Sequence, residues 1–121
     1  MSEDKTMKIL ISIEPRSYRE AIGEALRGLR SHLEVAVVEP EDLWEEVVRF
    51  EPALVIADRP DTLQTARKRA WVEFRPYEGP PAKICLGGRW RDLKEIDLPD
   101  LLSVVDEAEE LTRTSRDQPQ F

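Results

Sequence analysis

Two carboxylates follow short apolar runs of the sequence, at positions suited to ligand and phosphate chemistry. Glu14 follows the run 9–13 (ILISI), and Asp58 follows the run 54–57 (LVIA). Such runs are typical of strands buried in a parallel sheet. In open α/β sheets, ligands bind at the carboxyl ends of the strands. The sequence therefore predicts that Glu14 and Asp58 lie at one edge of a sheet.

Strands and amphipathic helices alternate in the first half of the chain and would position these two acids. Buried strands are predicted over 7–13, 33–38 and 53–57. Helices are predicted over 16–30 and 43–50, where apolar residues recur at helical spacing. This alternation favours right-handed βαβ crossovers and a parallel sheet.

The pattern changes after Asp58. The predicted segments are a short helix over 63–70, a half-exposed strand over 71–75 and two strands over 82–86 and 89–93. The pair Gly87 and Gly88 between the last two strands is a hairpin signal, because glycine accepts the positive φ of tight turns. A final helix is predicted with its apolar face over 98–108. Residues 1–6 and 113–121 are expected to be flexible.

Composition limits the classes of protein to consider. The 121 residues are 40% hydrophobic and 36% charged, which predicts one soluble globular domain over 1–121. The apolar runs are too short to cross a membrane, and the first residues lack the apolar core of a secretory signal. A single cysteine, Cys85, and a single histidine, His32, cannot build a disulfide or a thiolate–imidazole metal cage. These features predict a cytoplasmic protein.

Charge is distributed unevenly along the chain. The net charge of −7 makes nucleic-acid binding an unfavourable interpretation. Between residues 67 and 94, however, eight basic side chains stand against three acidic ones. This basic strip suggests an interaction surface that consists of Arg67, Lys68, Arg69, Trp71, Arg75, Lys83, Arg89, Trp90 and Arg91. A solvated strip with local ion pairs is the alternative interpretation.

Three segments are similar to one known family. The segment 8–14 (KILISIE) looks like its first strand, 51–58 (EPALVIAD) looks like its third strand, and Lys94 matches its lysine before the last helix. Over most of its length the chain thereby resembles the receiver domains of bacterial two-component response regulators. The resemblance implies that Asp58 stands at the phosphoacceptor position and that Glu14 and Asp58 stand at Mg²⁺-binding positions.

The chain also departs from that family at the same site. Ile13 stands where receivers carry a first acid, and Gly87 or Gly88 stands where they carry a hydroxyl residue. Mg²⁺ takes oxygen ligands, so these departures predict a vestigial site that holds neither phosphate nor metal. Gly88 and Lys94 are only six positions apart in the sequence. A parallel strand pair needs a crossover of a dozen or more residues, so an antiparallel arrangement is expected there.

These observations predict an α/β, flavodoxin-like three-layer sandwich with a mostly parallel sheet, in which an antiparallel C-terminal hairpin replaces the fourth receiver helix. The expected function is a non-catalytic regulatory or interaction module in the bacterial cytoplasm. It would work through a protein partner or a second copy, without a cofactor or a membrane. One alternative is a working receiver that accepts phosphate on Asp58 with Mg²⁺. The other is a small anionic-ligand or nucleic-acid binder that uses the strip 67–94.

Overall fold

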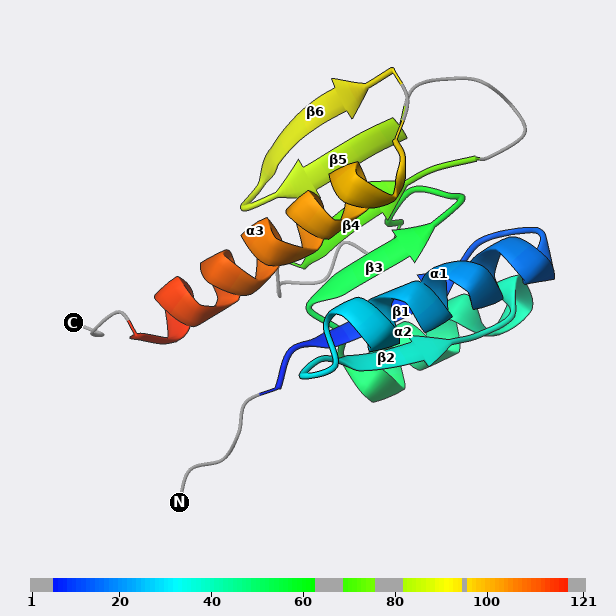
Figure 1. The fold of residues 1–121 in the computed structure, drawn as a ribbon, viewed down its shortest axis with the longest axis horizontal. Helices are drawn as coiled ribbons and strands as arrows, with labels where there is room; N and C mark the ends of the chain where they lie inside the picture. Colours follow the sequence, from blue (N-terminus) through cyan, green and yellow to red (C-terminus); the bar gives the residue numbers. More distant parts are fainter. Residues whose placement is uncertain (1–5, 63–68, 76–81, 95, 118–121) are drawn as a thin grey trace.

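A computed structural model describes residues 6–62, 69–75, 82–94 and 96–117, with side chains up to residue 112 (Figure 1). Within these residues a six-stranded mixed sheet carries helices on both faces, so the predicted α/β class is confirmed. The arrangement is compatible with a three-layer sandwich. The elements are β1 (Lys8–Ser12), α1 (Arg16–Leu29), β2 (Glu34–Val37), η1 (Pro40–Asp42), α2 (Leu43–Phe50), β3 (Leu54–Ala57), β4 (Ala70–Glu73), β5 (Ala82–Leu86), β6 (Arg89–Leu93) and α3 (Leu98–Asp117).

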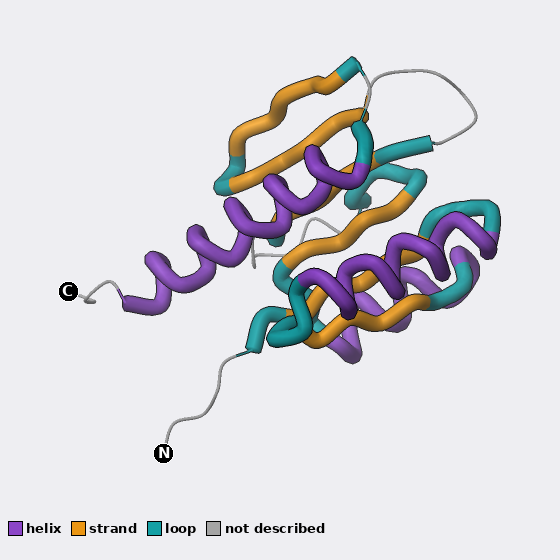
Figure 2. Tube along the Cα trace, in the orientation of Figure 1, coloured by secondary structure: helices purple, strands orange, loops and turns teal. Residues whose placement is uncertain are grey.

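The first part of the sheet is parallel, as the alternation of strands and helices predicts. The strand order is β2-β1-β3-β4-β5-β6, and β1, β2, β3 and β4 all run in one direction. Residues of α1 and α3 pack with one face of the sheet, and residues of α2 pack with the other (Figure 2). Helix α1 lies close to β2 because Gly23 has no Cβ; one built there would come within 2.7 Å of Val37.

Strand β4 is buried, which corrects the expectation of a half-exposed strand over 71–75. All four of its residues are buried, and Trp71 is only 1% exposed. Its indole stacks on that of Trp44 from α2, with ring centroids 5.8 Å apart. The helix expected over 63–70 falls largely on 63–68, outside the described residues, and Ala70 already belongs to β4.

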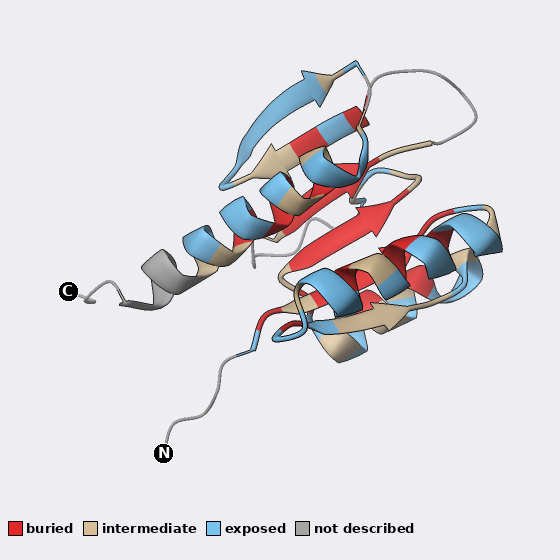
Figure 3. Cartoon of the chain, in the orientation of Figure 1, coloured by how far each residue is buried: buried red, intermediate tan, exposed pale blue. Residues whose placement is uncertain are grey.

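The predicted hairpin is confirmed. Strands β5 and β6 pair antiparallel, and the turn residues Gly87 and Gly88 have φ angles of 59° and 82°. Strand β4 pairs parallel with β3 and antiparallel with β5, so the sheet changes direction between β4 and β5. Figure 3 shows how burial falls from β3 and β4 towards β6, where four of five residues are exposed.

Helix α3 returns across the face that also carries α1. Arg30 at the end of α1 donates two hydrogen bonds, of 2.8 and 2.9 Å, to the carboxylate of Asp106 in α3. His32 approaches Glu109 of the same helix at 2.9 Å. The helix continues to Asp117, into the stretch that was expected to be flexible. Among the described residues, no helix is long and apolar enough to cross a membrane.

Candidate functional site

The carboxyl ends of β1 and β3 lie side by side, as the sequence predicts. Ser12 at the end of β1 stands opposite Ala57 at the end of β3. Glu14 and Asp58, which follow these strands closely, are therefore on neighbouring chain segments at the same edge of the sheet. This edge is the place where the resemblance to receiver domains would put a phosphoacceptor and a Mg²⁺ ion.

The first acid position of this edge is filled by hydrocarbon. Ile13 is fully buried within the cluster that joins the sheet to α1 and α3. Glu14 is exposed, and its carboxylate lies 4.0 Å from the guanidinium of Arg19. Arg19 is itself buried and donates a 3.4 Å hydrogen bond to the carbonyl of Ile13. A basic group therefore stands beside Glu14.

Asp58 is paired in the same manner. Its side chain is 16% exposed and accepts a hydrogen bond from Nε of Arg59 at 3.3 Å. Farther along the loop, Asp61 pairs with the buried guanidinium of Arg69 at 3.1 Å. Glu14, Asp58 and Asp61 thus each lie next to an arginine. Within the part of the chain that the structure describes, no three acidic, histidine or cysteine side chains are grouped so that they could hold a metal ion.

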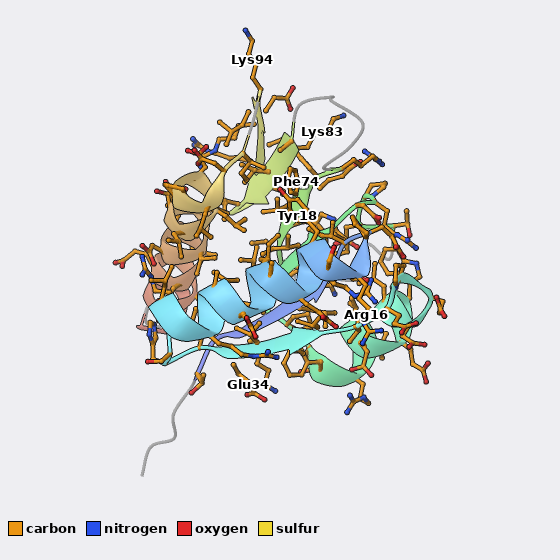
Figure 4. The ribbon with its side chains drawn as sticks, turned by 45° about the vertical axis from the view of Figure 1, so that its right-hand side comes forward. Arg16, Tyr18, Glu34, Phe74, Lys83 and Lys94 are labelled. Atoms are coloured by element: carbon orange, nitrogen blue, oxygen red, sulfur yellow. The ribbon has the colours of Figure 1, made fainter. Side chains whose placement is uncertain are left out.

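Lys94 lies at the same end of the sheet but far from Glu14 and Asp58. It follows β6, and β6 is three strands away from β3 in the sheet. Neighbouring strands are roughly 4.8 Å apart, so the two chain segments are separated by about 14 Å. Lys94 also points away from the body of the protein (Figure 4). In this structure Lys94 therefore does not lie beside Asp58, because the hairpin places it at the margin of the sheet.

Only some of the described residues of the basic strip are exposed at the protein surface. Arg67 and Lys68 lie outside the described residues. Trp71 is buried under Trp44, and the side chain of Arg69 is only 8% exposed and pairs with Asp61, so neither belongs to an exposed surface. The alternation of apolar and polar residues around Trp71 suggested exposure, but α2 covers this strand. Arg75 pairs with Glu73 at 2.8 Å.

The remaining members of the strip lie together on the β5–β6 hairpin. Lys83, Arg89, Trp90 and Arg91 are all exposed, and Trp90 is 56% exposed. Because cross-strand partners share a face of the sheet, Arg91 and its partner Ile84 lie on the α3 side. Trp90 and its partner Cys85, which packs with the cluster around α2, lie on the opposite side.

The backbone of β6 is open along its outer side. The amide of Ala70 in β4 donates to Ala53, towards β3, and the hydrogen-bonding direction alternates with each residue of a ladder. The pairing of β4 with β5, and of β5 with β6, carries this alternation from strand to strand. As a result, the backbone amides and carbonyls of Arg89, Arg91 and Leu93 point towards β5. Those of Trp90 and Asp92 point outward. In the described chain, no strand lies beyond them.

Two apolar hollows adjoin the sheet. One, of about 530 Å³, lies between β6 and α3, with Leu86, Arg89, Arg91 and Leu111 among its walls. The other, of about 230 Å³, lies between α1 and α3 and is walled partly by Tyr18 and Phe74, whose rings meet edge to face at 5.9 Å. Figure 4 shows these two rings between the helices. Sequence reasoning missed this second hollow; its only signal was Tyr18 on the apolar face of α1.

Comparison with known proteins does not assign this chain to a family. No family model, no curated protein and no solved structure matches this chain. The resemblance to receiver domains therefore rests on the residues of the sequence alone. Two surfaces of the molecule bear on function: the acidic edge, which carries Glu14, Asp58 and Asp61, and the β6 margin, which carries Arg89, Trp90 and Arg91.

Proposed function

We propose that this protein is a non-catalytic regulatory module, related to receiver domains, that acts by binding another protein through its β5–β6 hairpin. The observation that carries the proposal is Trp90, a large side chain 56% exposed on a strand at the margin of the sheet. Tryptophan and arginine are the residues most enriched in the energetically dominant contacts of protein interfaces. On β6, Trp90 stands between two exposed arginines.

The acidic edge supports the same proposal. Phosphorylation of a receiver-like aspartate needs a Mg²⁺ ion that neutralises phosphoryl charge and takes oxygen ligands in octahedral geometry. At this edge Ile13 supplies hydrocarbon, and Arg59 already pairs with the carboxylate of Asp58. A Mg²⁺ ion would have to displace the guanidinium and find further oxygen ligands. Regulation through protein contact requires neither step.

Exposure to a small phosphodonor with Mg²⁺, followed by intact-mass measurement, tests whether the module performs phosphoryl chemistry. We expect no mass change, in the presence or absence of Mg²⁺. The matched control is Asp58→Asn, which removes the acceptor and keeps the size of the side chain. A gain of one phosphate that requires Mg²⁺ and disappears in the control would overturn the proposal in favour of a working receiver.

A further inference from the structure

The outer side of β6 offers the elements that an additional strand needs. The amides and carbonyls of Trp90 and Asp92 point away from the sheet and have no backbone partner among the described residues. A peptide in extended conformation adds to such an edge through main-chain hydrogen bonds, and its alternate side chains give specificity. Charged residues on an edge strand discourage indiscriminate pairing. Arg89, Arg91 and Asp92 provide such charges here.

A second copy of this chain is a poor candidate for that strand. If two β6 strands paired antiparallel around Trp90, Arg89 of each copy would stand opposite Arg91 of the other. If they paired around Arg91, the two copies of Arg91 would be opposite each other. Like charges directly opposite in a sheet are destabilising. At strand β2, the other margin, the carbonyl of Val35 already accepts a 3.0 Å hydrogen bond from Arg27.

Charge indicates what the additional strand should carry. Residues 82–94 contain four basic side chains and one acidic one, although the whole chain has a net charge of −7. Arg89 makes no ion pair within the described part of the chain, whereas Arg91 pairs with Glu107 at 3.0 Å. Both partners in that pair are about half exposed, so the pair is weak and can be exchanged. The hairpin is therefore complementary to an acidic segment.

The alternation of β6 adds a side-chain pattern. Arg89 and Arg91 lie on the α3 side, and Trp90 lies on the other. Side chains of an added seventh strand would also alternate between the two faces of the sheet. Every second side chain would then lie beside the arginines, and the ones between them would lie beside Trp90. Acids every second residue, with apolar residues between them, would match both faces. On the α3 side, the hollow beside Leu86 and Leu111 gives room for such side chains.

We infer that β6 accepts an extended, acidic segment of a partner protein, with alternating acidic and apolar residues, as a seventh strand of the sheet. This inference rests on the proposed function and specifies the chemistry of its partner. The segment bonds to the outward amides and carbonyls of Trp90 and Asp92. Its acids meet Arg89 and Arg91, and its apolar residues pack on Trp90.

The test uses a short fluorescent peptide of alternating glutamate and valine, with binding followed by anisotropy and amide exchange followed by NMR. We expect binding to slow the exchange of the Trp90 and Asp92 amides. The amides of Arg91 and Leu93 should change little, because they already face β5. N-methylation of alternate peptide residues removes backbone donors and should weaken binding about tenfold or more, the cost of one or two hydrogen bonds.

Matched variants separate the charge of the site from the charge of the whole protein. Arg89→Glu should weaken binding of the peptide about tenfold, because the attraction between the exposed arginine and an acid of the peptide is replaced by repulsion. Arg16→Glu makes the same change of net charge on α1, where Arg16 pairs with Glu20 at the surface, and should leave binding nearly unchanged. An alternating lysine–valine peptide should not bind to the wild-type protein.

The outcomes distinguish the inference from the function on which it rests. If the peptide binds without protecting Trp90 and Asp92, strand addition is wrong, while an interaction module remains supported. If neither acidic peptide nor its N-methylated form binds, the partner chemistry is wrong. If an anionic oligonucleotide binds and Arg89→Glu abolishes that binding, both proposals are replaced by anion binding. Phosphorylation of Asp58 would replace the non-catalytic module by a working receiver, whereas protection of the Trp90 and Asp92 amides would still show that β6 accepts a strand.

Discussion

The two margins of the sheet differ in what covers them. At β2, the amides of Glu34 and Val38 donate towards β1, so the backbone groups of Val35 and Val37 point outward. Arg27 of α1 covers this side by bonding to the carbonyl of Val35. At β6, the backbone groups of Trp90 and Asp92 point outward without such a partner in the described residues.

The difference follows from how each margin is connected. A parallel strand needs a crossover, and the crossover that leads into β2 is α1, which packs against it and brings Arg27. A hairpin needs only a two-residue turn, so β6 joins the sheet without a helix of its own outside it. An edge made in this way is left with charged side chains as its protection. Connectivity thus explains why a helix reaches the β2 margin and bonds to it, while none of the described helices bonds to the outer side of β6.

The largest expected effect compares two tryptophans in one cross-strand row. Trp71 and Trp90 are both opposite Cys85, but Trp71 is 1% exposed and Trp90 is 56% exposed. Trp71→Ala should lower the free energy of unfolding by about 3–5 kcal/mol, because a large buried side chain is removed. Trp90→Ala should change it by about 0.5 kcal/mol or less. Denaturant titration measures both, and similar losses would show that β6 is not an open margin.

A smaller effect is expected when the closed margin is opened. Arg27→Ala leaves the carbonyl of Val35 to solvent, so the free energy of unfolding should fall by about 1 kcal/mol or less. The variant should also self-associate at high concentration in sedimentation experiments, because β2 becomes a free edge. Arg16→Ala removes the same charge from the same helix without touching β2. Equal association of the two variants would mean that Arg27 does not guard this margin.

The smallest effect concerns the ion pair that joins α1, on the β2 side, to α3, on the β6 side. The hydrogen bonds from Arg30 hold the pKa of Asp106 below its ordinary value of 3.8. A carboxylate whose pKa is lower in the folded state stabilises the fold above its unfolded pKa and loses this contribution as pH falls through its folded pKa. The effect should be small, because the Asp106 side chain is half exposed.

Unfolding of Arg30→Gln and of wild type, measured from neutral to acidic pH, tests this pair. Wild type should be slightly more stable at neutral pH, and the difference should shrink once the pH falls below 3.8 and Asp106 becomes protonated. His32 and Glu109 lie beside the pair, so the double variant with His32→Gln separates the contribution of His32. A difference that persists unchanged in acid would show that Arg30 acts through packing instead.

The positions of the two acids of the candidate site could be predicted from the sequence, but their pairing with arginines could not. Glu14 and Asp58 were expected at one edge because buried strands of a parallel sheet end together, and the register of Ser12 with Ala57 agrees. Their pairing with Arg19 and Arg59 was not expected. Whether an arginine reaches an acid depends on where the helix or loop that carries it lies in the fold. The sequence alone shows only that the arginines are present.

Local rules determined the elements of this protein from its sequence alone. The helical spacing in α1, the apolar runs of β1 and β3, and the turn at Gly87 and Gly88 each need only neighbouring residues to be interpreted. The small number of residues between Gly88 and Lys94 also excluded a parallel crossover. This conclusion needs no tertiary information, because the number of residues in a connection can be counted in the sequence.

Tertiary structure alone decided which surfaces are free. Trp71 and Trp90 both lie on short strands within the strip 67–94, yet α2 covers the first and nothing in the described chain covers the second. Arg69 and Arg89 are both arginines of the basic strip, yet the side chain of Arg69 is 8% exposed and pairs with Asp61, whereas Arg89 is exposed. The physical reason is that burial and pairing depend on contacts between distant segments, and these arise only when the sheet has brought its strands together.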